Sequence, residues 1–304
     1  MLRLEVQHRC CSRLSAANKP EIRSYLGELP YRAPGISMDL QLFAIIILTF
    51  VIHLIGTLAF AFRIAGIRTG HIAIAFSLFN AMVLVSRTSN SFQAPLLAKR
   101  VESSILEASS THLHWDFALI LAAASIATIV GGLLIPTVQR VATAAVSSFK
   151  KRRNLVRLTL RALTPRGASV VMQSVALPRY QNLTSLKISK GFPAVYIGMN
   201  FFATALWTVG VLSAIYAGTI DPEFRVTASS LSAVINGVAT IMMFILIDPY
   251  LAGLTDDVVE GEVSQGFYRR VLVWMVLSRL AGTVLAQILL VPGAHLIVAV
   301  ARWL

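Results

Sequence analysis

The chain has 304 residues, of which 56% are hydrophobic and only 13% are charged, and its formal net charge is +13. A soluble domain carries roughly 25% charged residues, whereas several apolar stretches here approach or exceed the ~20 residues that cross a bilayer. The composition therefore excludes a soluble α/β protein and predicts an all-α, polytopic membrane protein with about six transmembrane helices.

Residues 1–37 are polar and irregular and lack the apolar core of a signal peptide, whereas Met38 opens directly onto an apolar run. We interpret residues 1–37 as an upstream reading-frame artefact with the true start at Met38; the alternative is an N-terminal arm. Residues 38–304 are then predicted to form one six-helix transmembrane domain. The two cysteines, Cys10 and Cys11, are adjacent and offer no metal-ligand spacing, so they indicate little about function. We predict no metal site and no cofactor.

Six hydrophobic segments follow in the chain. They cover residues 40–62, 72–86 with an extension to 97, 117–138, 193–218, 226–247 and 271–291. Pro292 and Gly293 are predicted to interrupt the sixth segment, and the apolar tail 294–304 is too short to span a membrane alone.

The loop between the third and fourth segments fixes the predicted orientation. Residues 139–192 hold eleven Lys and Arg and no acidic residue, which is typical of a cytoplasmic loop under the positive-inside rule and disfavours nucleic-acid binding as the reason for the charge. Alternation then places both termini outside. We expect a multi-pass membrane protein, and the two groups of three helices permit an inverted-repeat transporter plan.

Arg279 lies about nine residues into the sixth segment, near a depth of ~13 Å. A central arginine costs roughly 2.5–3.5 kcal/mol to insert, and this one is too deep for its side chain to reach the interface comfortably. Two interpretations are open: a cation that faces a hydrophilic, anion-admitting cavity, or a structural arginine that is ion-paired or bonded to carbonyl groups inside the bundle.

The second segment needs an extension past residue 86 to reach spanning length, which places Arg87 in its outer half. Asn80, Arg87, Asn90 and Ser91 then share one broad face, and a polar stripe must face protein or water. We predict that this face lines a cavity. The alternative for Arg87 is an external-interface position bound to lipid headgroups.

Four further polar residues lie within or at the end of predicted spans. His53 is either a proton relay or a hydrogen-bonded structural residue. Asn200 and Asn236 are predicted to make helix–helix hydrogen bonds, with a cavity role as the alternative. Asp248 is predicted to mark the inner end of the fifth helix, and pairing with a buried arginine is its alternative.

Residues 53–95 carry a family resemblance. They begin at His53 and contain the runs RIAGIRT at 63–69, SLFN at 77–80, SRTSN at 86–90 and QAP at 93–95. This stretch resembles the N-terminal half of the Amj family, known as an alternative to the MurJ-type flippase. Beyond it the similarity over residues 38–304 is one of layout, and residues 1–37 have no counterpart.

The resemblance implies a flippase of the bacterial cytoplasmic (inner) membrane that moves lipid II, the undecaprenyl-linked peptidoglycan precursor, from the inner to the outer leaflet. Lipid II and membrane lipids would be its partners. Such cargo needs a polar cavity with cations for its pyrophosphate. The cavity candidates are Arg87, Arg279, Asn80, Asn90, Gln93 and His53. Arg63 and Arg68 are candidates to receive the headgroup at the inner face, with ordinary positive-inside anchoring as the alternative.

Three other functions are alternatives to lipid II transport. A transporter of another polyprenyl-linked glycan or of a small anion would need the same arginines. An intramembrane enzyme would need a cluster such as HExxH or GxSxG, which the sequence lacks. The Walker A motif that direct ATP use would need is also absent. No catalytic residue is predicted. A structural or regulatory membrane protein is the third rival. The oligomeric state is not predicted.

Overall fold

A computed structural model describes residues 39–106, 110–154, 158, 160, 164–178, 186 and 191–304. The regular secondary structure of these residues is entirely helical, and six helices are long and apolar enough to cross a membrane. The prediction of an all-α protein with about six transmembrane helices is therefore confirmed. The predicted extension 1–37 and start at Met38 lie outside the described residues and stay a prediction.

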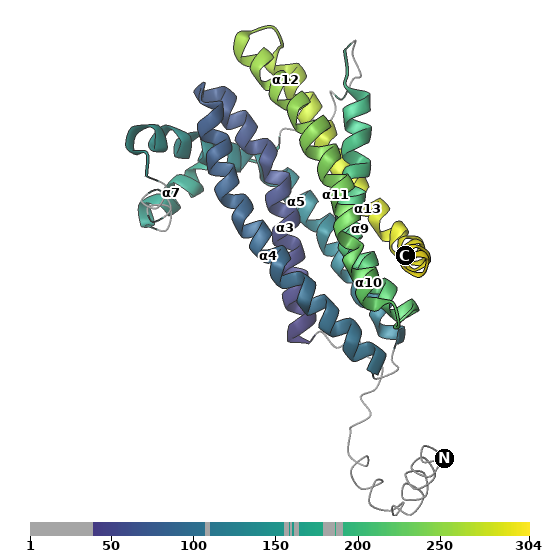
Figure 1. Ribbon diagram of the computed structural model, residues 1–304. Helices are drawn as coiled ribbons and strands as arrows, with labels where there is room; N and C mark the ends of the chain where they lie inside the picture. Colours follow the sequence, from purple (N-terminus) through teal and green to yellow (C-terminus); the bar gives the residue numbers. More distant parts are fainter. Residues whose placement is uncertain are drawn as a thin grey trace, which may run out of the picture. The chain divides into compact units, whose positions relative to one another are not determined.

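The helices pack side by side in a bundle (Figure 1). Their bounds are α3 Leu40–Thr69, α4 Ile72–Leu106, α5 Ser110–Arg152, the short α7 Pro165–Ser174, α9 Ala194–Ile220, α10 Arg225–Ser230, α11 Ser232–Ile241, the π-helix η1 Met242–Ile247, α12 Asp248–Glu260 and α13 Gln265–Trp303. The elements from α10 to α12 together form the fifth candidate span, Arg225–Glu260.

Several helices are longer than the hydrophobic segments that predicted them. Helix α4 continues to Leu106, α5 continues to Arg152 inside the stretch 139–192 predicted as a loop, and α12 occupies much of the stretch between the fifth and sixth predicted segments. Hydropathy reports only the part of a helix that lies in hydrocarbon, whereas a helix can continue into water with polar side chains. The predicted segment bounds were therefore too short at these ends.

One end of the bundle is tied by charged side chains. The guanidinium of Arg100 on α4 donates to Asp39 and to Asp116 on α5 at 2.8 and 2.7 Å, and Asp39 caps α3 by accepting from the Leu42 amide at 2.7 Å. Burial raises the pKa of the Asp39 carboxyl, but the Leu42 amide and Arg100 outweigh it and hold this pKa below its ordinary value. We call this end the Asp39 end.

The two halves of the chain pack in the same pattern. In the first half α3 packs most extensively on α5 and α4 lies against α3; in the second half α9 packs most extensively on α13 and α11 lies against α9. In both halves a glycine of the third helix meets a buried threonine of the first, Gly131 against Thr57 and Gly282 against Thr204. Corresponding helices run in opposite directions because each half has three spans, which agrees with an inverted-repeat plan.

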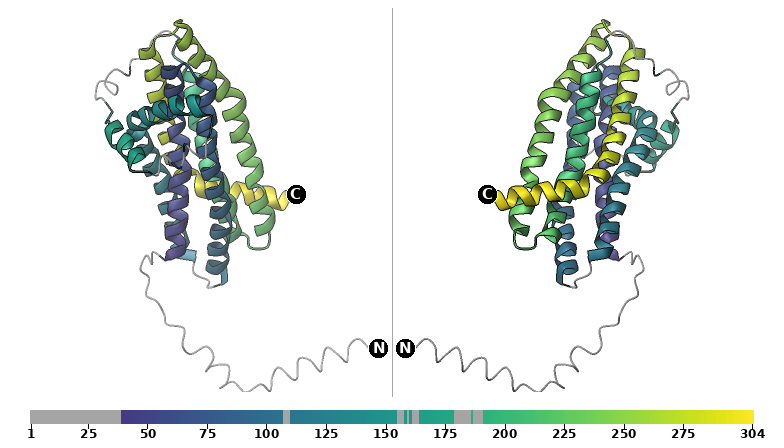
Figure 2. Two further views of the ribbon diagram at one scale, coloured as in Figure 1. Left: turned by 90° about the vertical axis from the view of Figure 1, so that its left-hand side faces the viewer. Right: turned by 90° about the vertical axis from the view of Figure 1, so that its right-hand side faces the viewer.

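Helix α13 continues through Pro292 instead of ending there. Its last turns change direction and run crosswise to the other helices of the bundle, as Figure 2 shows. Pro292 has no amide hydrogen, and its ring favours a kink at this point. The turned segment packs Ala294, Ile297 and Val298 against small residues of α9 and α10, and Arg302 pairs with Asp221 at 2.7 Å.

Candidate functional site

A pocket of about 590 Å³ opens between α3, α5, α13 and the residues that follow α7. Three arginines from three different helices, Arg68, Arg140 and Arg269, belong to its lining. All three are exposed. We call the end of the bundle that holds them the Arg68 end.

The three arginines create a concentrated positive charge. Arg269 and Arg140 act electrostatically on Arg68, and none of the three takes part in the ion pairs found among the described residues. Guanidinium groups bind phosphate oxygens through charge-assisted, often bidentate hydrogen bonds. The mouth of the pocket is therefore suited to an anion with several oxygen acceptors.

The walls of the pocket are apolar. They include Leu133 on α5 and Leu272, Val276, Leu277 and Leu280 on α13. From Arg269 to Leu280 the lining covers ~16 Å along α13 at 1.5 Å per residue, about half the thickness of the hydrocarbon layer. The pocket thus combines a cationic mouth with an apolar interior, which suits an amphiphilic ligand.

Arg279 lies next to the deep end of this lining, one residue before Leu280. Its side chain is only 8% exposed, and the guanidinium rests against Gly56 of α3. Its charge also acts on the buried His53 of the same helix. Within the described ranges no carboxylate lies at ion-pair distance, and Nε of Arg279 has no hydrogen-bond partner. The ion-pair interpretation of Arg279 therefore finds no support among these residues.

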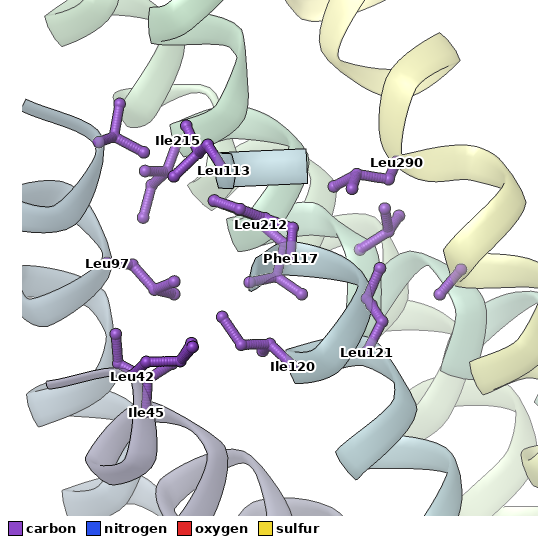
Figure 3. Packing of buried hydrophobic residues seen from close by; sticks show 13 residues of the cluster. Leu42, Ile45, Leu97, Leu113, Phe117, Ile120, Leu121, Leu212, Ile215 and Leu290 are labelled. Atoms are coloured by element: carbon purple, nitrogen blue, oxygen red, sulfur yellow. The ribbon is translucent and has the colours of Figure 1, made fainter. Parts of the chain in front are cut away.

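Hydrogen-bonded polar groups continue from this level toward the Asp39 end. The hydroxyl of Ser125 on α5 donates to that of Thr283 on α13 at 3.0 Å, and Gln287 donates to Ser125 at 3.4 Å. Beyond them an apolar cluster from α3, α4, α5, α9 and α13 fills the bundle, with Phe117 and Leu121 among its members (Figure 3). The helices that line the pocket at one end are thus packed together at the other.

The structure brings only some of the predicted cavity residues near Arg279. His53 lies beside it, and Gln93 is buried but bonds Thr49 of α3 at 2.6 Å. Asn80, Arg87 and Asn90 are not part of the pocket lining; they are exposed on α4. The predicted set is therefore divided between the bundle interior and its outer surface.

The two inner-face candidates have different surroundings. Arg68 lies in the pocket mouth, whereas Arg63 is 5% exposed and donates to Asp248 at 2.6 Å. The Arg63 guanidinium also lies over the ring of Phe76, 4.8 Å from its centroid. Asp248 thus pairs with a buried arginine, the alternative that the sequence left open, and the fifth span continues past it through α12.

Asn200 makes the predicted helix–helix bonds, donating to the Met275 carbonyl at 2.9 Å and to the Ser278 hydroxyl at 2.8 Å. For Asn236 the buried Oδ1 has no partner. Sequence reasoning missed Arg140 and Arg269 as site residues because loop charge was counted only for orientation. Neither residue stands out in the sequence, since only the packing of α5 against α13 brings them beside Arg68.

Comparison with known proteins identifies the family. Residues 48–301 match the family model described as Amj, Alternate to MurJ. The chain belongs to the Amj family. A relative from Bacillus subtilis (strain 168) named Lipid II flippase Amj is 36% identical over 258 residues, which cover 83% of this chain and 94% of the relative. No solved structure matches the chain. The Amj match includes all three pocket arginines and Arg279.

Proposed function

We propose that this protein is a flippase that moves lipid II from the inner to the outer leaflet of the bacterial cytoplasmic membrane. The observation that carries the proposal is the pocket with three arginines at its mouth and apolar walls that extend to mid-depth. A polyprenyl diphosphate has the same division into a polyanion and a hydrocarbon chain. The name of the Bacillus subtilis relative supports lipid II as the cargo.

The proposed orientation places the Arg68 end in the cytoplasm and both termini outside. The basic stretch 139–192 is connected to this end through α5, which carries Lys150 and Lys151 in its last turn. Lys and Arg concentrate in cytoplasmic loops. Lipid II is made on the inner face, so a pocket that opens at the Arg68 end would receive it from the correct side.

In the proposed capture step, Arg68, Arg140 and Arg269 bind the pyrophosphate. Charge-assisted hydrogen bonds of this kind contribute about 1.5–3 kcal/mol each. The first isoprene units would lie against Leu133 and Val276, so that the hydrocarbon does not enter water. The large sugar-peptide headgroup would remain at the mouth, where it keeps its contact with solvent.

Arg279 and His53 would serve the passage beyond the pocket. Arg279 is a cation at mid-depth with an unbonded Nε, so a phosphate that leaves the pocket mouth would find a second binding partner in the membrane interior. His53, next to it, is the candidate for coupling the movement to a proton.

Passage to the outer leaflet would require α5 and α13 to separate at the Asp39 end. The packed apolar cluster holds this end together (Figure 3), and the Ser125–Thr283 hydrogen bond joins α5 to α13 nearer to mid-depth. In transporters with inverted repeats, one half rocks against the other about a site near the midplane. The proposed cycle therefore alternates between a pocket open at the Arg68 end and an equivalent opening at the Asp39 end.

The test is rescue of bacteria whose essential MurJ-type flippase can be switched off. The full chain is expected to restore survival and outer-face lipid II, and the double variant Arg140→Gln, Arg269→Gln is expected to fail at equal membrane abundance. Arg270→Gln is the matched control, since Arg270 neighbours Arg269 but is not part of the pocket lining.

A well-inserted wild-type protein that does not rescue would contradict lipid II as the cargo and favour another polyprenyl-linked glycan or a small anion. Rescue that survives loss of Arg140, Arg269 and Arg279 would contradict the role proposed for the arginines.

A further inference from the structure

The outward face of α4 carries polar residues along most of its length, among exposed apolar residues that include Leu84, Val85 and Phe92. One side of this helix packs into the bundle through Ala75, Leu78, Gln93, Leu97 and Val101. The opposite side is exposed and carries Ser77, Asn80, Arg87, Asn90, Ser91 and Lys99. Most of these positions recur at helical spacings of three, four, seven or eight residues and form a stripe along the helix.

Arg87 lies near the middle of the membrane on this face. It is 16 residues from His71 at the Arg68 end and 13 from Arg100 at the Asp39 end, or ~24 and ~20 Å along the helix. Since the hydrocarbon layer is ~30 Å thick, an arginine near the centre of this span lies roughly 15 Å from either interface, beyond the comfortable reach of its side chain. Exposed to hydrocarbon, its charge would be very unfavourable.

The bundle itself supplies no anion for Arg87, because none of the ion pairs among the described residues includes it. A second copy packed symmetrically on this face would not supply one either. Two copies with the same membrane orientation would be related by an axis along the membrane normal. Each Arg87 would then meet its counterpart at the same depth, where two like charges repel strongly.

A lipid phosphate fits this face in charge, and polar groups stand on both sides of Arg87. Helical side chains lean toward the N-terminus, so Arg87 reaches over Leu84 toward Asn80. One turn beyond Arg87 lies the exposed Ser91. Lys99 follows two turns later. The intervals between these groups are ~5–12 Å.

We propose that the outward face of α4 carries the phosphate headgroups of membrane glycerophospholipids between the leaflets while their acyl chains stay in the bilayer. This is a second activity, beyond the proposed lipid II transport. It needs neither the pocket nor an undecaprenyl chain, because the pocket is lined by α3, α5, α13 and the residues after α7 and not by α4.

The test uses the purified full chain in vesicles of phosphatidylcholine and phosphatidylglycerol with a trace of fluorescent phosphatidylglycerol. Dithionite bleaches the outer-leaflet probe, and the second phase reports its arrival from the inner leaflet. Wild-type protein is expected to speed this phase at least about tenfold over empty vesicles. Arg87→Leu should return it to near the empty-vesicle rate, and Arg87→Lys should keep most of it.

Two controls separate the possible failures. Phe92→Leu changes an exposed apolar residue of α4 and should leave the rate unchanged. The Arg140→Gln, Arg269→Gln variant should still move phospholipid while losing lipid II transport, so either activity can fail without the other.

The proposal is overturned if folded wild-type protein moves phospholipid no faster than empty vesicles do, or if Arg87→Leu moves it as fast as wild type. It is also overturned if Ser91→Cys in a chain whose Cys10 and Cys11 are replaced by Ser forms a disulfide between two copies in the membrane, because a second copy would then cover this face.

Discussion

The guanidinium of Arg279 on α13 occupies the space that a Cβ atom at position 56 of α3 would need. Gly56 lies inside a regular helix, so its role is the close approach of another side chain and not an unusual backbone conformation. The two helices thus hold a buried cation between them at mid-depth. The position of this cation depends on the absence of one methyl group.

Replacing Gly56 by Val should therefore push the guanidinium away from its position. We expect lipid II transport to fall by about 100-fold, as for other small displacements of a functional group, while membrane insertion is kept. Outer-face lipid II in the rescue strain is the measurement. Gly198→Ala is the matched control because a Cβ there meets nothing within 4 Å. Equal transport by Gly56→Val and wild type would contradict a role for the position of Arg279.

The pocket arginines should govern cargo affinity in a salt-dependent way. Each of Arg140→Gln and Arg269→Gln should weaken binding of undecaprenyl diphosphate about tenfold, since each removes one charge-assisted contact. Added salt should reduce the wild-type affinity because all three arginines are exposed. Titration of the purified protein in detergent measures both effects. A wild-type affinity that does not change with salt would argue against binding by these groups.

Joining α5 to α13 should stop the proposed cycle. The side-chain oxygens of Ser125 and Thr283 lie 3.0 Å apart, so cysteines at these positions are near enough to test for a disulfide. With Cys10 and Cys11 replaced by Ser, oxidation of Ser125→Cys, Thr283→Cys should abolish lipid II transport, and reduction should restore it. Each single cysteine variant serves as the control. Full activity of the cross-linked protein would show that α5 and α13 need not separate there.

The Arg63–Asp248 pair should stabilise the Arg68 end. Replacing Asp248 by Asn leaves a buried guanidinium without its anion, and we expect a loss of about 1–3 kcal/mol. Thermal unfolding in detergent is the measurement. A double-mutant cycle with Arg63→Gln should show coupling between the two changes, whereas additive effects would mean that the 2.6 Å contact contributes nothing.

The Asp39 end should lose stability in acid. The pKa of Asp39 lies below the ordinary value of an aspartate in the folded protein, so this carboxylate stabilises the fold above that ordinary value, and the contribution is lost as the pH falls through the lower, folded-state pKa. Melting curves recorded from pH 6 down to about 2 should therefore show a smaller decline for Asp39→Asn than for wild type. Parallel declines in the two proteins would contradict this assignment.

The sequence by itself determined the fold class and the number of spans. A hydrophobic fraction of 56% with six long apolar segments leaves a bilayer as the only environment in which such helices can be placed. The family was also within reach, since residues 53–95 carry local patterns that do not depend on packing. Arg279 and Arg68 stood out because a charge within or beside an apolar run is visible in one dimension.

The tertiary structure decided which of these residues meet. Arg140 and Arg269 are 129 positions apart in the chain, and only the packing of α5 beside α13 places both in the pocket with Arg68. It also separated Asn80, Arg87 and Asn90 from Arg279, because α4 packs into the bundle through its opposite face. Periodicity defines the faces of a helix, but the neighbouring helices determine which face is covered.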